Sequence, residues 1–141
     1  MIIIAHRGNI NGKEPNKENS PEYIQDAISL GYGVEVDIWE LEGELWLGHD
    51  RPTYSIETDW LLKRSDDLWI HAKNLEVVEI LATTNLNWFW HSKDKMTLTS
   101  KTIPWCYGGI YMKNGITVEL GIPKEIPEKI LGICTDYAKL W

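Results

Sequence analysis

The sequence has little cysteine, little basic charge and no long apolar segment. Its two cysteines, Cys106 and Cys134, allow one disulfide at most, and we expect two buried, reduced thiols in a cytoplasmic protein. The 14 Lys and Arg residues are outnumbered by 21 Asp and Glu residues, so the net charge is −7. This balance argues against nucleic acid or an anionic membrane as the main partner. The apolar run Met1–Ala5 is too short for a membrane span or a secretory leader, and we expect neither.

The length and composition are those of one folded domain. The chain has 141 residues, of which 43% are apolar, and this is enough for a single core over residues 1–141. Eight tryptophans are many for this length, and several alternate with other residues in apolar runs. Such alternation is typical of strand faces and large pockets.

Short apolar runs and helix signals alternate along the first half of the chain. Ser20 and Pro21 are typical of the first residues of a helix, and Gly31 is typical of its end. Helices are therefore expected over residues 21–30, Ile56–Arg64 and Leu75–Thr83. Strands are expected over Met1–Ala5, Gly33–Glu40, Glu44–Gly48, Asp67–Ala72, Asn87–His91, Met96–Thr99, Ile103–Tyr107, Ile116–Glu119 and Ile130–Cys134.

This alternation predicts a parallel sheet with helical crossovers, hence an α/β fold. A complete eight-fold barrel usually needs about 250 residues. We therefore expect an abbreviated (β/α) TIM-like barrel with several outer helices missing. An open α/β sheet and a partial barrel completed by a second copy are the alternatives. The missing helices would leave apolar surface exposed, and this predicts a homodimer.

Three polar clusters lie at the C-terminal ends of predicted strands, where the ends of parallel strands converge on one surface. They are His6-Arg7-Gly8, Glu35-Val36-Asp37 and Gly48-His49-Asp50. Glu35 and Asp37 are two residues apart on a strand, so both carboxylates lie on one face and repel each other unless a cation lies between them. Their oxygens suit Mg²⁺, Ca²⁺ or Mn²⁺.

The other residues of these clusters fit chemistry on a phosphate. His6 and His49 could act as an acid–base pair, in which one removes a proton and the other protonates a leaving group. Arg7 offers a planar guanidinium to phosphate oxygens. Together these residues predict metal-assisted cleavage of a phosphodiester, a small-molecule substrate.

The order of these motifs resembles the glycerophosphodiester phosphodiesterase family. The matching segments are His6-Arg7-Gly8, Glu18-Asn19-Ser20, Glu35-x-Asp37 and His49-Asp50, in the first third of the chain, and Thr135-Asp136 near its end. The resemblance implies a phospholipase-C-like barrel of lipid metabolism that releases glycerol 3-phosphate through a cyclic phosphate, with Mg²⁺ or Ca²⁺ as the metal. The donor chemistry of the residues adds Mn²⁺ as an alternative. It implies that His6 and His49 are catalytic, that Arg7 holds the phosphate, and that Glu35 and Asp37 are metal ligands.

The chain departs from that family pattern at the next strand. The family has a third acidic ligand in a Glu-x-Lys setting, and here the segment is His71-Ala72-Lys73. Lys73 is expected to contact the phosphate, because a lysine in an apolar strand region needs an anionic partner. His71 is either a metal ligand, which would shift the preference towards Mn²⁺ or Zn²⁺, or a core histidine.

Other residues have supporting roles or none. Asp50 is expected to orient His49, and Glu18 to pair with Arg7 or to lie on the surface. His91 is either at the rim of the site or on the surface, and Asp136 is expected only to hold the closing end of the barrel.

Two other functions compete with hydrolysis. A degenerate barrel could bind a phosphodiester without turnover, as a sensor or a subunit of a larger assembly. A narrower alternative is an intramolecular phosphodiester transfer on a lipid or a surface polysaccharide, which the acidic surface does not favour.

Overall fold

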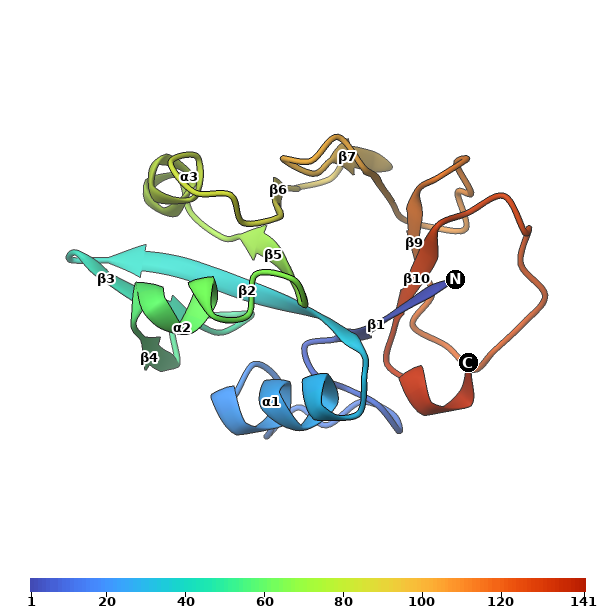
Figure 1. Cartoon of the computed structure of the whole chain (residues 1–141), viewed down its shortest axis with the longest axis horizontal. Helices are drawn as coiled ribbons and strands as arrows, with labels where there is room; N and C mark the ends of the chain where they lie inside the picture. The colour runs from blue at the N-terminus through green and yellow to red at the C-terminus, as the bar shows by residue number, and fades with distance from the viewer.

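The computed structural model describes the whole chain, residues 1–141, as one sheet with short helices (Figure 1). The helices are α1 (Pro21–Ser29), α2 (Thr58–Leu62), α3 (Leu75–Leu81) and a final 3-10 helix, η1 (Ala138–Leu140). The strands are β1 (Ile2–His6), β2 (Gly33–Leu41), β3 (Glu44–Leu47), β4 (Tyr54–Ile56), β5 (Leu68–Ala72), β6 (Trp88–Trp90), β7 (Met96–Leu98), β8 (Pro104–Cys106), β9 (Ile116–Val118) and β10 (Gly132–Thr135). The predicted helices and strands are confirmed to within a few residues, whereas β4 and η1 were not predicted.

The ten strands form a curled, mixed sheet. A parallel run contains β6, β5, β2, β1, β10, β9 and β8 in that order. The β3–β4 hairpin adds antiparallel strands beside β2, and β7 is antiparallel to β8. The two ends of the curl approach each other, because Ser100 N donates to Trp88 O at 2.6 Å. No ladder of backbone hydrogen bonds joins β6 to β7, so the sheet is a half-barrel.

The prediction of an abbreviated (β/α) TIM-like barrel is therefore wrong. That fold needs a helix after nearly every strand, and this chain has three short helices, none of them between β6 and β10. Turns and loops make these later connections, so β7 pairs antiparallel with β8. In Figure 1 the helices α1, α2 and α3 lie beside the blue to yellow half, and the orange to red half has loops and η1.

The convex face of the first half of the sheet packs against the helices to form the larger core. Helix α1 begins at the Ser20 cap, whose hydroxyl accepts a hydrogen bond from Tyr23 N at 3.3 Å. Apolar residues from the three helices meet the outward side chains of β2 and β5 in this core: Ile24, Ala27, Leu61, Val77 and Leu81 against Val34, Val36, Ile38, Ile70 and Ala72.

The concave face has an apolar floor and a polar rim. A second buried cluster fills the floor with Ile4, Trp69, Phe89, Trp105, Ile116 and Cys134. Successive residues of a strand point to opposite faces, so the residues two positions further along share the concave face. These are His6, His71, His91, Tyr107, Val118 and Asp136. The strand pattern thus gathers polar side chains above a closed apolar layer, at the carboxyl ends of the parallel strands.

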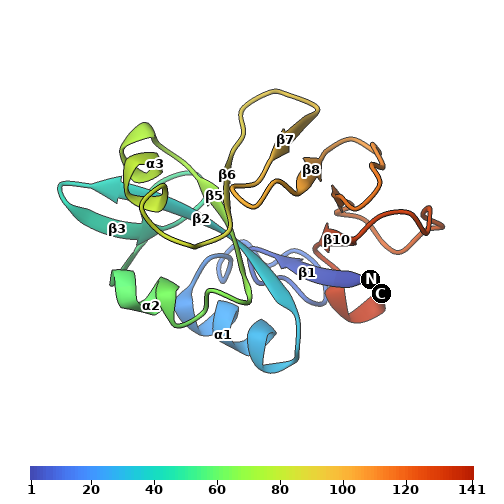
Figure 2. The ribbon, with the colours of Figure 1, turned by 45° about the horizontal axis from the view of Figure 1, so that its top comes forward.

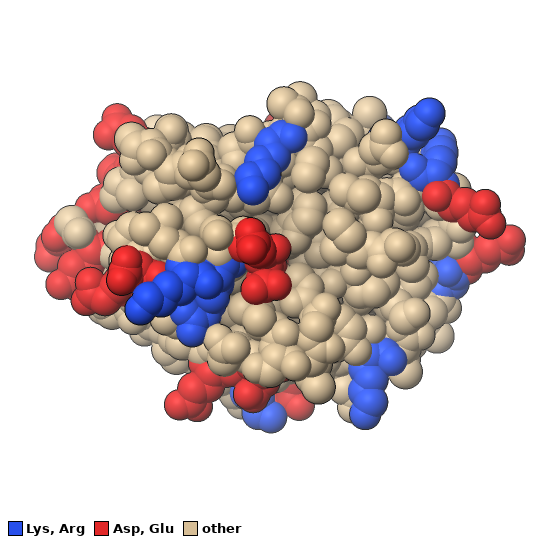
Figure 3. Space-filling view, in the orientation of Figure 1, with Lys and Arg blue, Asp and Glu red and all other residues tan.

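Surface features bear on the predicted partners and thiols. Figure 3 shows acidic side chains at the end of the molecule where the β2–β3 hairpin lies, and that hairpin contributes Glu40, Glu42 and Glu44. None of the helices has the length and apolar character needed to cross a bilayer. Cys106 and Cys134 are free and buried, as predicted. The cytoplasmic location and the homodimer stay predictions.

Pairing of β1 with β10 joins the two halves of the sheet, and the two ends of the chain lie side by side (Figure 2). A methyl group at Gly132 would overlap the Ile2 carbonyl and lie 2.8 Å from Ile2 Cβ. We expect Gly132→Ala to lower the free energy of unfolding by about 1–3 kcal/mol, the usual effect of overpacking. Gly121→Ala is the control, because a methyl group there meets nothing within 4 Å. Urea denaturation measures the free energy of unfolding of both variants, and equal values would contradict the pairing of β1 with β10.

Candidate functional site

The register of three parallel strands brings the predicted site residues into one row. His6 of β1 lies opposite Glu35 of β2, and Asp37 of β2 lies opposite His71 of β5. Arg7 and Lys73 directly follow β1 and β5. His6, Arg7, Glu35, Asp37, His71 and Lys73 all line one cavity of about 320 Å³ at the rim of the concave face.

Two carboxylates are buried side by side in this row. Glu35 is 3% exposed and Asp37 is fully buried. Burial and the neighbouring Asp37 charge raise the pKa of Glu35, although His6 and His71 oppose the shift. Burial would also raise the pKa of Asp37, but His71, Lys73 and Asn19 outweigh it and lower that pKa to about 2. The structure therefore favours the charge on Asp37 over that on Glu35.

Asp37 is held firmly on one side and left open on the other. Asn19 Nδ2 donates to Asp37 Oδ2 at 2.8 Å, and the Asp37 backbone N–H donates to Asn19 Oδ1 at 3.0 Å. Arg7 Nε lies 3.5 Å from Oδ2, and Lys73 Nζ lies 3.7 Å from Oδ1. Asp37 Oδ1 and Arg7 Nε are nevertheless buried without a hydrogen-bond partner. A buried polar atom in this state is costly, so both atoms suit a bound ligand.

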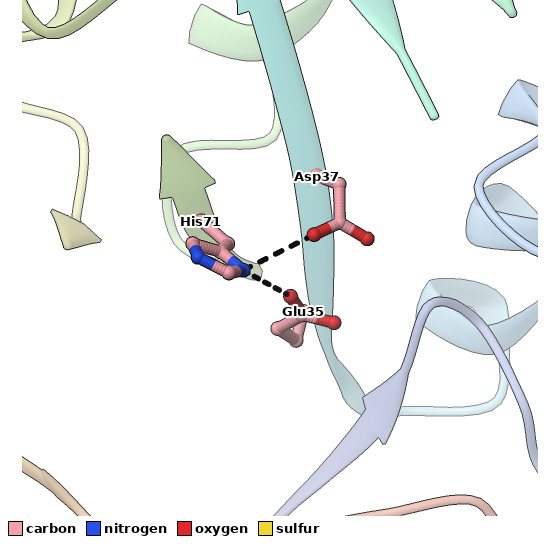
Figure 4. A group of neighbouring side chains, drawn as sticks. All are labelled: Glu35, Asp37 and His71. Carbon is pink, nitrogen blue, oxygen red and sulfur yellow. Dashed lines mark ion pairs between the residues drawn. The ribbon is translucent and has the colours of Figure 1, made fainter. Parts of the chain in front are cut away.

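His71 directs one ring nitrogen at the two carboxylates. Its Nδ1 lies 3.2 Å from Asp37 Oδ1 and 3.9 Å from Glu35 Oε1 (Figure 4). Its Nε2 lies 3.3 Å from the His91 carbonyl, which can only accept, so a neutral ring that bound a cation would carry its proton on Nε2 and offer the Nδ1 lone pair. A backbone carbonyl that binds the second ring nitrogen is the usual partner of a metal-ligating histidine.

Glu35, Asp37 and His71 fit a divalent cation. One ligand atom from each residue lies within 4.8 Å of the other two. Ligands at about 2.0–2.6 Å from a common ion are at most about 4–5 Å apart, so one ion can reach all three. The orphaned Asp37 Oδ1 and the directed lone pair of His71 also suit a cation. Two oxygens and one imidazole nitrogen form a donor set that suits Mn²⁺ as well as Mg²⁺.

His6 is oriented from the opposite end of the chain. Its Nδ1 lies 2.8 Å from Asp136 Oδ1, and its Nε2 faces Glu35 Oε2 at 3.8 Å. Burial would lower the pKa of His6, but Asp136 and Glu35 raise it above its usual value. Asn9 Nδ2 donates to Asp136 at 2.8 Å and to Glu18 at 2.9 Å. The Asp136 carboxylate thus fixes the His6 ring with Nε2 directed into the cavity.

His49 lies on the loop after β3, apart from the row of ligands. It lines the same cavity, but its side chain is 39% exposed and its only charged partner is Asp50, 2.7 Å from Nδ1. Trp39 Nε1 donates to the Gly48 carbonyl at 2.5 Å, and a methyl group at Gly48 would overlap the Arg51 carbonyl. These contacts fix the start of the loop. Partial burial lowers the pKa of His49, so its ring is mostly neutral near pH 7.

Aromatic rings form the wall of the cavity opposite the carboxylates. The His91 and Tyr107 rings are stacked with centroids 3.8 Å apart, and Trp105 Nε1 donates to the Tyr107 hydroxyl at 2.9 Å. Burial raises the pKa of Tyr107 far above its usual value, so its hydroxyl keeps its proton. Of the two predicted locations for His91, the structure therefore gives the rim of the site.

Some supporting residues of the site were predicted from the sequence and others were not. The structure pairs Glu18 with Arg7 at 3.1 Å, one of the predicted alternatives, and Asp50 contacts His49 as predicted. Asp136 does more than hold the end of the sheet, because it orients His6. Asn9 and Asn19 were given no role in the site, although Asn19 belongs to the quoted Glu18-Asn19-Ser20 segment and Asn9 lies in the polar loop after His6-Arg7-Gly8.

No family model, curated protein or solved structure matches this chain, so its function is inferred from the site itself.

A divalent cation bound at Glu35, Asp37 and His71 should stabilise the fold. A concentration of Mn²⁺, Mg²⁺ or Ca²⁺ about 100 times its dissociation constant raises the free energy of unfolding by about 2.7 kcal/mol. Glu35→Gln should remove this effect without destabilising the metal-free protein, since burial already favours an uncharged Glu35. Exposed Glu79 provides the control, Glu79→Gln. Chemical denaturation with and without each ion is the measurement, and stabilisation that survives in Glu35→Gln would exclude this site.

Proposed function

We propose that this chain is a metal-dependent phosphodiesterase. Its substrate would be a glycerophosphodiester, or a related phosphodiester, and its products glycerol 3-phosphate and an alcohol. The observation that carries the proposal is the meeting of three elements at one cavity. They are the Glu35–Asp37–His71 cluster, the Arg7 guanidinium with its unpartnered Nε, and the His6 ring oriented by Asp136.

The order of the motifs along the chain supports the same activity. His6-Arg7, Glu18-Asn19, Glu35-x-Asp37 and His49-Asp50 follow one another as in the glycerophosphodiester phosphodiesterase family, which they resemble. The resemblance supports the proposed activity only, because the fold is a curled mixed sheet and not the barrel of that family.

Positive groups beside the carboxylates would hold the phosphate. Arg7 Nε needs a partner, and Lys73 Nζ is 3.7 Å from Asp37 at the edge of the same cavity. Both groups can donate to non-bridging phosphate oxygens. A divalent cation at Glu35, Asp37 and His71 would neutralise phosphate charge and help an attacking hydroxyl to lose its proton.

The two histidines would transfer the protons. The glycerol hydroxyl on the carbon adjacent to the phosphate ester attacks phosphorus, and the bond from phosphorus to the alcohol oxygen breaks. This step forms a cyclic phosphate, which water then opens. One of His6 and His49 accepts the proton of the attacking hydroxyl, and the other donates a proton to the leaving oxygen. Both rings line the cavity, and Asp136 and Asp50 hold the Nδ1 atoms, which leaves each Nε2 for the substrate.

Phosphodiester binding without turnover is the second candidate function. The observation that favours it is the compensation of Asp37 by Arg7 at 3.5 Å and Lys73 at 3.7 Å, which balances the buried charge without a metal ion. Such a protein would bind a phosphodiester as a sensor or as a subunit of a larger assembly.

Loss of either histidine should abolish most of the activity. We expect His6→Ala and His49→Ala each to lower kcat by about 100-fold or more, the usual contribution of a general acid or base. The measurement is ³¹P NMR of glycerophosphodiesters with Mg²⁺, Ca²⁺ or Mn²⁺, with circular dichroism to verify folding. A cyclic phosphate that persists as the end product would indicate intramolecular transfer. Saturable binding with no turnover under any metal would favour the binding function.

Asp136 should affect catalysis through the orientation of His6. In Asp136→Asn the amide can donate to His6 Nδ1 and so reverse the ring tautomer, which moves the proton to Nε2. We expect kcat to fall at least about tenfold with little change in KM, the scale of loss for an orienting partner. Steady-state kinetics test this. A change confined to KM would mean that Asp136 acts on substrate binding instead.

A further inference from the structure

A second, larger cavity adjoins the proposed reaction site. It has a volume of about 740 Å³, and its walls come from the loop before α1 and the loop between β3 and β4. Arg7 and His49 line both this outer cavity and the inner one of about 320 Å³. The two cavities therefore meet at Arg7, which is expected to hold the phosphate, and at His49, which is expected to transfer a proton there. A phosphodiester has two arms that extend from its phosphorus.

The two cavities differ in chemistry. The inner cavity includes the apolar and aromatic side chains of Trp105, Tyr107, Val118 and Leu120. Only one of the 12 residues that line the outer cavity is hydrophobic. Both volumes lie within the usual range for small-molecule sites, the inner one near its lower limit. A compact arm such as glycerol fits the inner cavity, and a larger polar arm fits the outer one.

Two cations of the outer cavity lack a partner. Lys13 and Arg51 line it from opposite loops, and neither has a carboxylate within 4.0 Å of its side-chain nitrogens. The two acidic residues of this cavity already have partners: Glu18 pairs with Arg7 and Asp50 with His49. In a chain of net charge −7, two cations without ion-pair partners at one polar cavity favour an anionic ligand.

We propose that the outer cavity is a subsite for the alcohol arm of the substrate, and that this arm carries a second anionic group, a phosphate or a carboxylate, bound by Lys13 and Arg51. The inference rests on the proposed phosphodiesterase function and specifies its substrate class. Arg7 and His49 contact the scissile phosphate, the glycerol arm occupies the inner cavity, and the charged arm extends between the two loops.

A matched pair of substrates tests the subsite. Glycerophosphoinositol and its 4-phosphate share both arms and differ by one anionic group. We expect kcat/KM to be at least about tenfold higher for the phosphorylated diester, which corresponds to one charge-assisted contact. Lys13→Ala/Arg51→Ala should bring the ratio close to one. Lys113→Ala/Lys129→Ala removes the same charge from exposed positions outside both cavities and should leave the ratio unchanged.

Calorimetric titration of both diesters into the His6→Ala protein separates this inference from the proposed function. A preference for the phosphorylated diester that depends on Lys13 and Arg51, without turnover by the parent protein, would support the subsite and reject the phosphodiesterase. Equal hydrolysis of both diesters, unchanged in Lys13→Ala/Arg51→Ala, would reject the subsite and keep the phosphodiesterase. If neither diester binds and neither is hydrolysed, both proposals fail.

Discussion

The buried pair of carboxylates on β2 is the constraint around which the site is built. Glu35 and Asp37 share one strand face, 3% and 0% exposed, and such a pair is unfavourable without compensation. Each surrounding element contributes to that compensation: β1 provides His6 and Arg7, the segment after β5 provides Lys73, and the loop before α1 provides Asn19. The central position of β2, between β1 and β5, is what makes contributions from both sides possible.

The sequence predicted the elements and the row of site residues, and it failed on the architecture. Period-two apolar runs and helix caps are local signals, so β1, β2 and α1 could be located, and polar residues that end parallel strands were expected to meet. The barrel was predicted from the alternation of strands and helices and from the motif resemblance, although most segments after β6 are short and Pro123 and Pro127 interrupt the longest one. The contact of His6 with Asp136 spans 130 positions, and the pairing of Asn19 with Asp37 depends on a loop conformation. Neither contact produces a periodic or local pattern in the sequence.

The site combines a rigid part and a part carried on a loop. His6, Glu35, Asp37 and His71 project from hydrogen-bonded strands above an apolar floor, where packing fixes their geometry. His49, Lys13 and Arg51 lie on loops, with Trp39 and Gly48 fixing the start of one of them. Strands are suited to hold buried ligands at constant distances, and loops are suited to vary the group that is recognised. Changes in the loops can therefore alter which substrate arm is recognised, while the strands keep the arrangement of charges around the phosphorus.

Pairing of β1 with β10 also has a consequence for how the chain reaches its folded state. His6 is synthesised 130 residues before its partner Asp136. Until β10 is made, β1 has an open edge on one side, and the His6 ring lacks its Asp136 partner. Contacts between residues so distant in sequence slow folding, because loop closure must precede the gain from pairing. The β1 edge of the nascent chain is therefore exposed to aggregation until β10 is added.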